Sequence, residues 1–147
     1  MTPPLRTLFV YGTLKRGGHN HALVAHADTV VPAHTPGALY DLPGGYPALL
    51  PGAAHGVAHG ELLTFATLDG TLEALDAFEG YDPCDPAGSE YLREAVTVTL
   101  EHGAQVTAWA YTFTPERVAR YRAVHVPAGR WDAHAPRPFE FRKRAGE

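Results

Sequence analysis

The sequence predicts a single α+β domain, a small mixed β-barrel or curled sheet with a few short helices. The chain has 147 residues, the size of one ordinary domain, and no internal repeat or low-complexity linker divides it. Several segments rich in β-branched and aromatic residues are typical of strands, whereas few segments have a helical pattern. Several strands with few helices favour a barrel or curled sheet over a fold of repeated strand–helix–strand units.

The N-terminal part predicts a buried strand, a loop and a short helix. The strand is Thr7–Tyr11, a run of β-branched and aromatic residues that Gly12 closes. The stretch at residues 12–18 contains too many glycines for a helix or a strand, so we expect a loop there. A short helix is expected at His21–Ala27.

The next part predicts strands separated by turns. Two strand pieces are expected, Thr29–His34 and Ala38–Asp41, with Pro36-Gly37 interrupting them. The residues of Leu42–Pro51 are mainly turn formers, so we expect a turn segment there. The segment Val57–Phe65 returns to a strand pattern.

The clearest helical pattern of the chain lies at Leu68–Glu79. A three-residue spacing places its large apolar residues on one face, namely Leu72, Leu75 and Phe78. We expect Asp69 or Thr71 to cap the start of this helix and Gly80 to end it.

The C-terminal half predicts a loop, a hairpin and an extension. The loop is Tyr81–Glu90, in which turn-forming residues predominate. Apolar and polar residues alternate in Arg93–Leu100, and a turn at His102-Gly103 leads into the partner strand Gln105–Phe113. From Pro115 a helical turn is expected, followed by a tail rich in proline and arginine.

Composition and charge exclude several classes of protein. Hydrophobic residues make up 45% of the chain and charged residues 19%, as in globular proteins. The net charge of -4 provides no broad basic field for nucleic acid, and no apolar run is long enough to span a membrane. The single cysteine, Cys84, and the lack of a secretion signal at the N-terminus lead us to expect a cytoplasmic protein.

The loop Tyr11-Gly12-Thr13-Leu14, directly after the first strand, is the first candidate site. A chain that leaves a buried strand through glycine can point consecutive backbone N–H groups at an anion or a developing oxyanion. The alternative is a plain turn. A phosphate-binding loop is excluded, because Gly18-His19 stand where that motif has lysine and serine or threonine.

Glu79 is the second candidate, because it is the last residue of the helix with the apolar face. A carboxylate there would lie at the edge of an apolar wall, and partial desolvation would raise its pKa and make it a better general base. The alternative is a glutamate in solvent, where most glutamates lie.

Other reactive residues form no convincing site. His55 and His59 have the spacing of a zinc pair on a helix, but the segment has a strand pattern and no cysteine pair or acidic cluster accompanies it, so no metal site is expected. Ser89 lacks the surroundings of a serine nucleophile, and neighbouring acids disfavour the Cys84 thiolate. The basic patch at 137–144, with Phe139 and Phe141 interleaved, is expected to be a solvated chain end.

Two motifs in order resemble the γ-glutamylcyclotransferase-like family, most closely the γ-glutamylamine cyclotransferases and their bacterial relatives. The first is FVYGTLKRG at Phe9–Gly17, and the second is LDAFE at Leu75–Glu79. Two later segments are also similar to the family, YLREAV at Tyr91–Val96 and AWAY at Ala108–Tyr111. The similarity covers residues 7 to 113, so residues 114–147 are expected to be a C-terminal extension of a single 1–147 domain.

The resemblance implies a small β-barrel flanked by helices, no metal or organic cofactor, and a small-molecule γ-glutamyl substrate that is converted into 5-oxoproline and a free amine. The Tyr11–Leu14 loop would receive the glutamyl part and Glu79 would be the general acid/base, with Tyr46 and Tyr111 as further pocket residues. The departing amine is expected to lie towards Tyr46 and the Gly80–Glu90 loop. That loop is longer than expected after the glutamate, and it carries several acids and only distant cations.

Two other classes of function remain open at this level. The first is a non-catalytic module that binds a small carboxylate or amide. The second is a hydrolase or acyl transferase that acts on γ-glutamyl amides through external water or an external amine. The sequence leaves open which substrate group the loop holds, which amine departs and how many subunits assemble.

Overall fold

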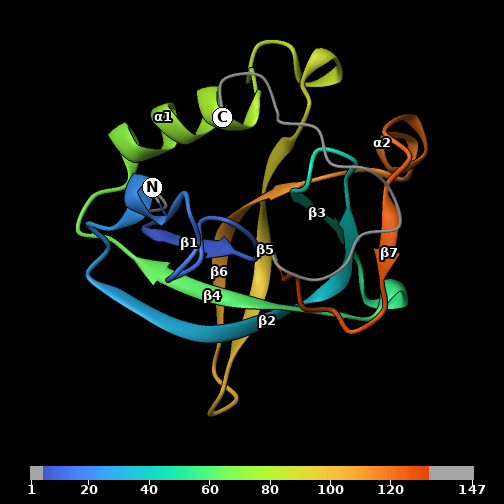
Figure 1. Cartoon of the computed structure of the whole chain (residues 1–147). Helices are drawn as coiled ribbons and strands as arrows, with labels where there is room; N and C mark the ends of the chain where they lie inside the picture. Colours follow the sequence, from blue (N-terminus) through green and yellow to red (C-terminus); the bar gives the residue numbers. More distant parts are fainter. Residues whose placement is uncertain (1–4, 133–147) are drawn as a thin grey trace.

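The computed structural model describes residues 5–132, in which five strands close a mixed barrel (Figure 1). The barrel strands are β1 (Thr7–Val10), β2 (Thr29–Asp41), β4 (Val57–Thr64), β5 (Leu92–Leu100) and β6 (Gln105–Thr112). They neighbour one another in the order β2-β4-β1-β6-β5, and β5 pairs again with β2. Strand β1 runs parallel to β6, and the other pairs are antiparallel. The predicted barrel of mixed strands is therefore confirmed.

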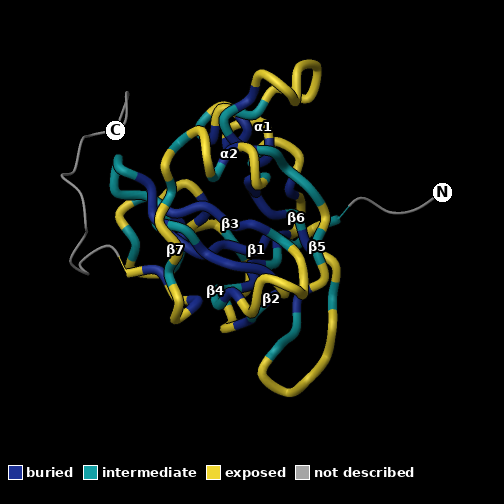
Figure 2. Tube along the Cα trace, turned by 90° about the vertical axis from the view of Figure 1, so that its right-hand side faces the viewer, coloured by how far each residue is buried: buried dark blue, intermediate teal, exposed yellow. Residues whose placement is uncertain are grey.

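Strand β1 is apolar from Leu8 to Val10, where both of its faces are buried. Leu8 packs in a cluster that includes Leu72 and Leu75, whereas Phe9 packs in a second cluster with residues of the other barrel strands. Figure 2 shows the buried residues gathered in the central strands and the exposed ones in the connections. The first predicted strand and the loop after it are confirmed, and the end of β1 lies fixed in the core.

The prediction of two interrupted pieces in β2 is wrong, because the strand continues through Pro36-Gly37. Up to Pro36 it pairs with β4, and from Gly37 it pairs with β3 (Pro47–Pro51). The final residues of β2 also pair with β7 (Val124–Val126). Gly37 has φ +154°, which lets the chain change partners without leaving the strand.

Strand β3 corrects the prediction of a turn segment at Leu42–Pro51. Its prolines occupy the two ends of the strand, where loss of an N–H donor is tolerated. The middle residues are buried, and Leu49 O accepts a hydrogen bond from Phe113 N at 2.7 Å. The turn formers of this segment therefore bound a short strand.

Helix α1 (Asp69–Glu79) lies across one end of the barrel, as Figure 1 shows. The predicted helix and its end are confirmed, since Gly80 has the left-handed φ of +70°. The predicted side-chain cap is wrong. No side chain caps the start of α1, and the Thr71 hydroxyl instead lies 2.7 Å from Nε2 of His26.

The buried face of α1 differs from the predicted apolar face. Leu72 and Leu75 are buried as expected, but Phe78 is only half-buried. The remaining buried residues of the helix are Asp76 and Glu79. Two carboxylates thus belong to the face that covers the barrel end.

The remaining elements are short. The helix expected at His21–Ala27 is a 3-10 turn, His21–Val24, and two more such turns lie at Ala53–His55 and Pro86–Gly88. Helix α2 (Pro115–Arg120) confirms the helical turn expected from Pro115. No helix of the described residues is long and apolar enough to cross a membrane. The predicted basic patch at 137–144 lies outside the described residues.

Candidate active site

A pocket that is partly open to solvent lies where the end of α1 meets the barrel, and the space between its walls, open solvent included, is about 410 Å³. Its lining comes from the end of β1, the loop after it, the start of β3 with the residue before it, the end of α1, the residue before β5, and β6. The lining residues are Phe9, Val10, Tyr11, Gly12, Thr13, Leu14, Tyr46, Pro47, Phe78, Glu79, Tyr91 and Tyr111. All seven residues proposed from the sequence line this one pocket.

The loop after β1 is held in shape by its own hydrogen bonds. Lys15 N donates to Gly12 O at 3.1 Å, and Asn20 N donates to Thr13 O at 3.0 Å. The Asn20 amide also donates to Thr13 Oγ1 at 2.9 Å, and Nδ1 of His21 lies 2.8 Å from Leu14 O. The pocket wall that the loop forms is therefore shaped before a ligand arrives.

Gly12 is required by the close approach of Pro47. A Cβ atom at Gly12 would lie 2.3 Å from Pro47 Cγ, far inside van der Waals contact. Since both residues line the pocket, a side chain at Gly12 would force the two walls of the pocket apart.

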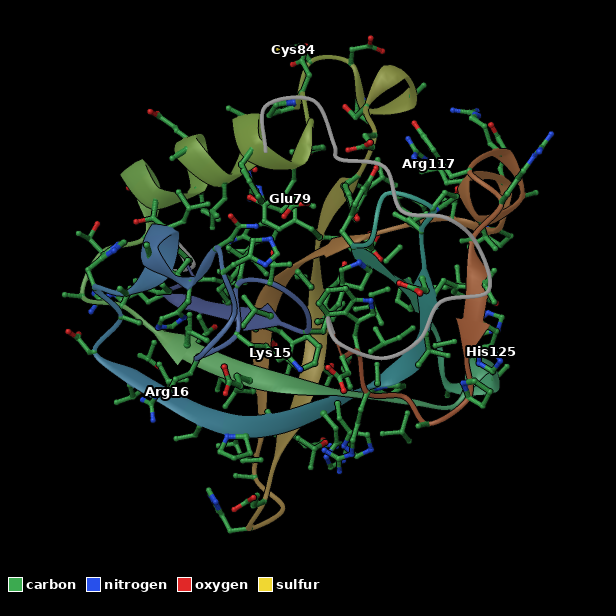
Figure 3. All side chains as sticks on the ribbon, in the orientation of Figure 1. Lys15, Arg16, Glu79, Cys84, Arg117 and His125 are labelled. Carbon is green, nitrogen blue, oxygen red and sulfur yellow. The ribbon has the colours of Figure 1, made fainter. Side chains whose placement is uncertain are left out.

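Glu79 is the last residue of α1 and is only 8% exposed. Figure 3 places it beneath the end of α1, on the side of the barrel. Phe78 and Tyr91 line the same pocket, so aromatic residues form part of the wall to which Glu79 belongs. Burial and a position in a pocket wall suit a group that exchanges protons with a substrate.

Tyrosines form much of the pocket wall, and hydrogen bonds fix them. Tyr11 donates to the backbone oxygen of Tyr111 at 2.6 Å, and Tyr91 donates to Pro47 O at 2.5 Å. The Tyr111 hydroxyl donates to Asp76 Oδ1 at 2.7 Å. Burial, followed by this hydrogen bond, raises the pKa of Tyr111 well above its usual value, so the phenol remains protonated.

Sequence reasoning missed Asp76 and Arg93. Arg93 Nε donates to Asp76 Oδ1 at 2.9 Å and Nη2 donates to Oδ2 at 3.3 Å, directly behind the wall that Tyr111 forms. One signal was available: Asp76 precedes Glu79 by three residues, so both belong to one helix face. Arg93 was noted only as part of the YLREAV segment.

The loop after Glu79 was expected to have only distant cations, but a cation, Arg117, contacts it directly. Arg117, labelled in Figure 3, is 6% exposed and holds this loop by its backbone. Its Nε donates to Glu90 O at 3.0 Å, and Nη2 donates to Pro86 O at 2.9 Å and Ser89 O at 3.0 Å. The acid of this loop that approaches the pocket is Glu90, whose Oε2 accepts from the Tyr46 hydroxyl at 3.5 Å.

The other reactive groups lie outside the pocket lining. His55 is exposed, whereas His59 packs against His34 with ring centres 5.7 Å apart. Burial, with smaller effects of Arg130 and His34, lowers the pKa of His59. Over residues 5–132 no three side chains of His, Cys, Asp or Glu gather as metal ligands would. Ser89 hydrogen-bonds within its own loop, and Cys84 is exposed.

Comparisons with known sequences point to one family. The family model described as "Gamma-glutamyl cyclotransferase, AIG2-like" matches residues 8–133, so the similarity extends beyond residue 113 and includes α2 and β7. A Vibrio cholerae protein named "Putative gamma-glutamylcyclotransferase" is 36% identical over 108 residues. The alignment covers 72% of this chain and 80% of that protein.

Solved structures share the fold. YkqA from Bacillus subtilis is 25% identical with a TM-score of 0.61 over 86% of this chain, although the match spans only 39% of YkqA. An AIG2-like protein from Mus musculus is 23% identical with a TM-score of 0.61, and the match covers 99% of this chain and 100% of that one. The pocket, the family match and the shared barrel agree: the chain belongs to the gamma-glutamyl cyclotransferase, AIG2-like family and is an enzyme of the gamma-glutamylcyclotransferase type.

Proposed function

We propose that the protein converts a γ-glutamyl amine into 5-oxoproline and a free amine, with Glu79 as the general acid/base. The observation that carries this proposal is that the buried Glu79 and the Tyr11–Leu14 loop line the same pocket. A general base must lie within reach of the proton it takes, and a buried carboxylate in the wall of a pocket suits that need.

The reaction needs one group that both takes and returns a proton. Glu79 takes a proton from the α-ammonium of the substrate, and the freed amine attacks its own γ-carbonyl carbon. As the tetrahedral intermediate collapses, the bond from this carbon to the departing nitrogen breaks, and protonated Glu79 gives its proton to that nitrogen. The ring nitrogen loses its second proton to water, so 5-oxoproline keeps one lactam N–H, and the released amine takes up a proton from water. Because the attack is intramolecular, the main task of the pocket is to hold the glutamyl part in a folded conformation.

The Tyr11–Leu14 loop binds anionic oxygen of the substrate, either the α-carboxylate or the oxyanion that forms on the γ-carbonyl. Support for this role comes from its position, since the loop lines the same pocket as the end of α1 and its internal hydrogen bonds fix its shape. Backbone N–H groups fixed in advance stabilise negative charge without the cost of reorganisation.

The departing amine leaves towards Tyr46 and Glu90. Tyr46 lines the pocket and contacts the Glu90 carboxylate, and the N–H groups of Arg117 are directed to backbone oxygens of the same loop. A cationic or neutral amine therefore suits this side better than a leaving group with its own carboxylate. We expect ε-(γ-glutamyl)-lysine to be used with a higher kcat/KM than glutathione.

A product screen tests the proposed reaction. Purified protein is incubated with γ-glutamyl amines, γ-glutamyl amino acids and glutathione, and products are separated by chromatography. We expect 5-oxoproline and the free amine in equal amounts. Release of glutamate would instead show a hydrolase, and a new γ-glutamyl compound would show an acyl transferase. Equal or better use of glutathione would overturn the leaving-group preference alone.

A further inference from the structure

Helix α1 brings a second carboxylate, Asp76, to the buried face that carries Glu79. The two residues are three positions apart and are 9% and 8% exposed. Side chains at this spacing are neighbours on a helix surface. Neighbouring carboxylates in a buried setting repel each other, and the repulsion favours proton uptake by one of them. A pocket that uses Glu79 to exchange protons therefore needs the charge of Asp76 to be balanced.

Arg93 on β5 balances this charge. Its two hydrogen bonds to Asp76, at 2.9 and 3.3 Å, form a bidentate ion pair. The Arg93 side chain is 16% exposed and that of Asp76 is 13% exposed. The guanidinium carbon lies 4.5 Å from the centre of the Trp109 ring and 5.5 Å from that of Tyr81. Ring stacking and the ion pair together hold Arg93 in one position.

Tyr111 connects the ion pair to the pocket. Its hydroxyl donates to the Asp76 oxygen that Arg93 Nε also contacts, and its side chain lines the pocket with Glu79. The charges of Asp76, Arg93 and Glu79 all act on the pKa of the Tyr111 hydroxyl, after the larger effect of burial. The Asp76–Arg93 pair and Glu79 therefore both lie close enough to the Tyr111 hydroxyl for their charges to act on it.

Other ionisable groups surround this cluster from the neighbouring elements. Tyr11 from the end of β1, Tyr46 from the segment before β3 and Tyr91 from the segment before β5 line the pocket. Glu90 lies against Gly80, and Arg117 of α2 contacts the backbone oxygen of Glu90. Within residues 5–132, Arg93 binds a carboxylate of α1, whereas the N–H groups of Arg117 donate to backbone oxygens and to the Thr114 hydroxyl.

We propose that Arg93 is a positioning residue of the active site: its ion pair with Asp76 neutralises the second carboxylate of α1 and leaves Glu79 to exchange protons in the pocket. This inference rests on the function proposed above for Glu79. Loss of the Arg93 cation leaves an anion beside Glu79, so Glu79 holds its proton more tightly. Loss of the Asp76 anion leaves a cation beside Glu79, so Glu79 releases its proton more readily.

Titration of Glu79 in the intact protein tests this proposal. The protein is labelled with ¹³C at the glutamate side-chain carboxyls, and the Glu79 signal is identified by its absence in Glu79→Gln. We expect Arg93→Gln to raise the midpoint of the Glu79 titration by about one pH unit, and Asp76→Asn to lower it by about half a unit or more. The acid limb of kcat/KM should move in the same directions.

Arg120→Gln is the matched control, because Arg120 forms an exposed ion pair with Glu116 on α2. Its Glu79 midpoint should equal that of the wild type. Midpoints that stay at the wild-type value in both test variants, or that move in the same direction, overturn the proposal. If Arg93→Gln does not fold, Asp76→Asn decides the matter alone, and a midpoint at or above the wild-type value overturns the proposal.

The titration needs no substrate, so it separates this inference from the proposed function. If no γ-glutamyl compound is turned over, the proposed function fails, but the midpoints of the Glu79 titration still show whether Arg93 acts on the pKa of Glu79. If Glu79→Gln abolishes turnover but the midpoints do not move, the function stands and the role of Arg93 fails. Arg93→Lys adds a further check. Lysine retains the cation but loses the bidentate contact with Asp76, so the midpoint of the Glu79 titration should stay near the wild-type value.

Discussion

Gly12 shows how a single residue determines the shape of this pocket. Its position against Pro47 leaves no room for a Cβ atom, and both residues belong to the lining. We expect Gly12→Ala to lower the free energy of unfolding by about 1–3 kcal/mol, the usual cost of overpacking, and to reduce kcat/KM as the walls separate. Urea unfolding and steady-state kinetics measure the two effects.

Gly70→Ala is the matched control for this change. Gly70 is an exposed residue in the first turn of α1, and an added Cβ atom would meet nothing within 4 Å. Alanine there should raise stability by up to about 1 kcal/mol, because it is the better helix former. A Gly12→Ala protein as stable and as active as Gly70→Ala would contradict this account of the pocket wall.

Residues differ in how much of their role the sequence reveals. Glu79 could be singled out because it ends an apolar-faced helix just before a glycine. For Asp76 the sequence offers only its three-residue spacing from Glu79, and nothing local points to Arg93, because a helix pattern says nothing of a partner on a distant strand. Their pairing depends on the packing of α1 over β5 and β6, and only the folded chain brings them together.

At the scale of elements, α2 acts as an anchor for the loop at Tyr81–Glu90. Arg117 of this helix is buried, and its N–H groups satisfy three backbone oxygens of the loop. Arg117→Met removes these donors, and of the three oxygens Pro86 O still accepts from Ser89 N, so we expect the free energy of unfolding to fall by about 2 kcal/mol or more. Since the loop borders the proposed leaving-group side, KM should rise by a larger factor than kcat falls.

Thermal unfolding and kinetics with ε-(γ-glutamyl)-lysine measure these effects. Arg117→Lys should recover part of the loss, because an ammonium can reach some of the same oxygens. The control is Arg120→Met on the same helix, whose exposed pair with Glu116 contributes at most about 1 kcal/mol. Equal behaviour of the Arg117 and Arg120 variants would refute the anchoring role.

Strands and helices with a regular apolar pattern could be predicted from the sequence. Strands that form only because a neighbouring strand pairs with them could not. Helix α1 and the β5–β6 hairpin follow local periodicity, and both are confirmed. Strand β3 begins and ends with proline, so its local signals indicate turns, and it becomes a strand through pairing with β2. Strand β2 continues past Pro36-Gly37 for the same reason, because each half has its own partner.

At the scale of the whole molecule, barrel closure is what assembles the site. The loop after β1 and the end of α1 are more than 60 residues apart in sequence, and they meet because β1 lies in the barrel wall that α1 covers. The sequence predicted each part of the pocket separately. Tyr46 and Tyr111, which both line the pocket, were proposed only from the family resemblance, because their place in the lining depends on how β3 and β6 pack.

The proposed reaction requires neither a metal nor a side-chain nucleophile. We therefore expect a chelator, and separately Cys84→Ala, to leave kcat/KM within about twofold of the untreated wild type, as for changes that leave transition-state contacts intact. Kinetics before and after dialysis against the chelator provide the measurement. Loss of turnover that zinc restores would contradict this expectation and direct attention to His55 and His59.

The central claim is that Glu79 transfers the protons of the cyclisation, and the turnover of Glu79→Gln tests it most directly. Glutamine keeps the shape of the side chain but cannot accept a proton from the α-ammonium. The control is Glu73→Gln, at an exposed position of the same helix. We predict that Glu79→Gln loses at least about 100-fold in kcat with KM nearly unchanged, while Glu73→Gln matches the wild type. Formation of 5-oxoproline by Glu79→Gln at a rate near that of the wild type would contradict the claim.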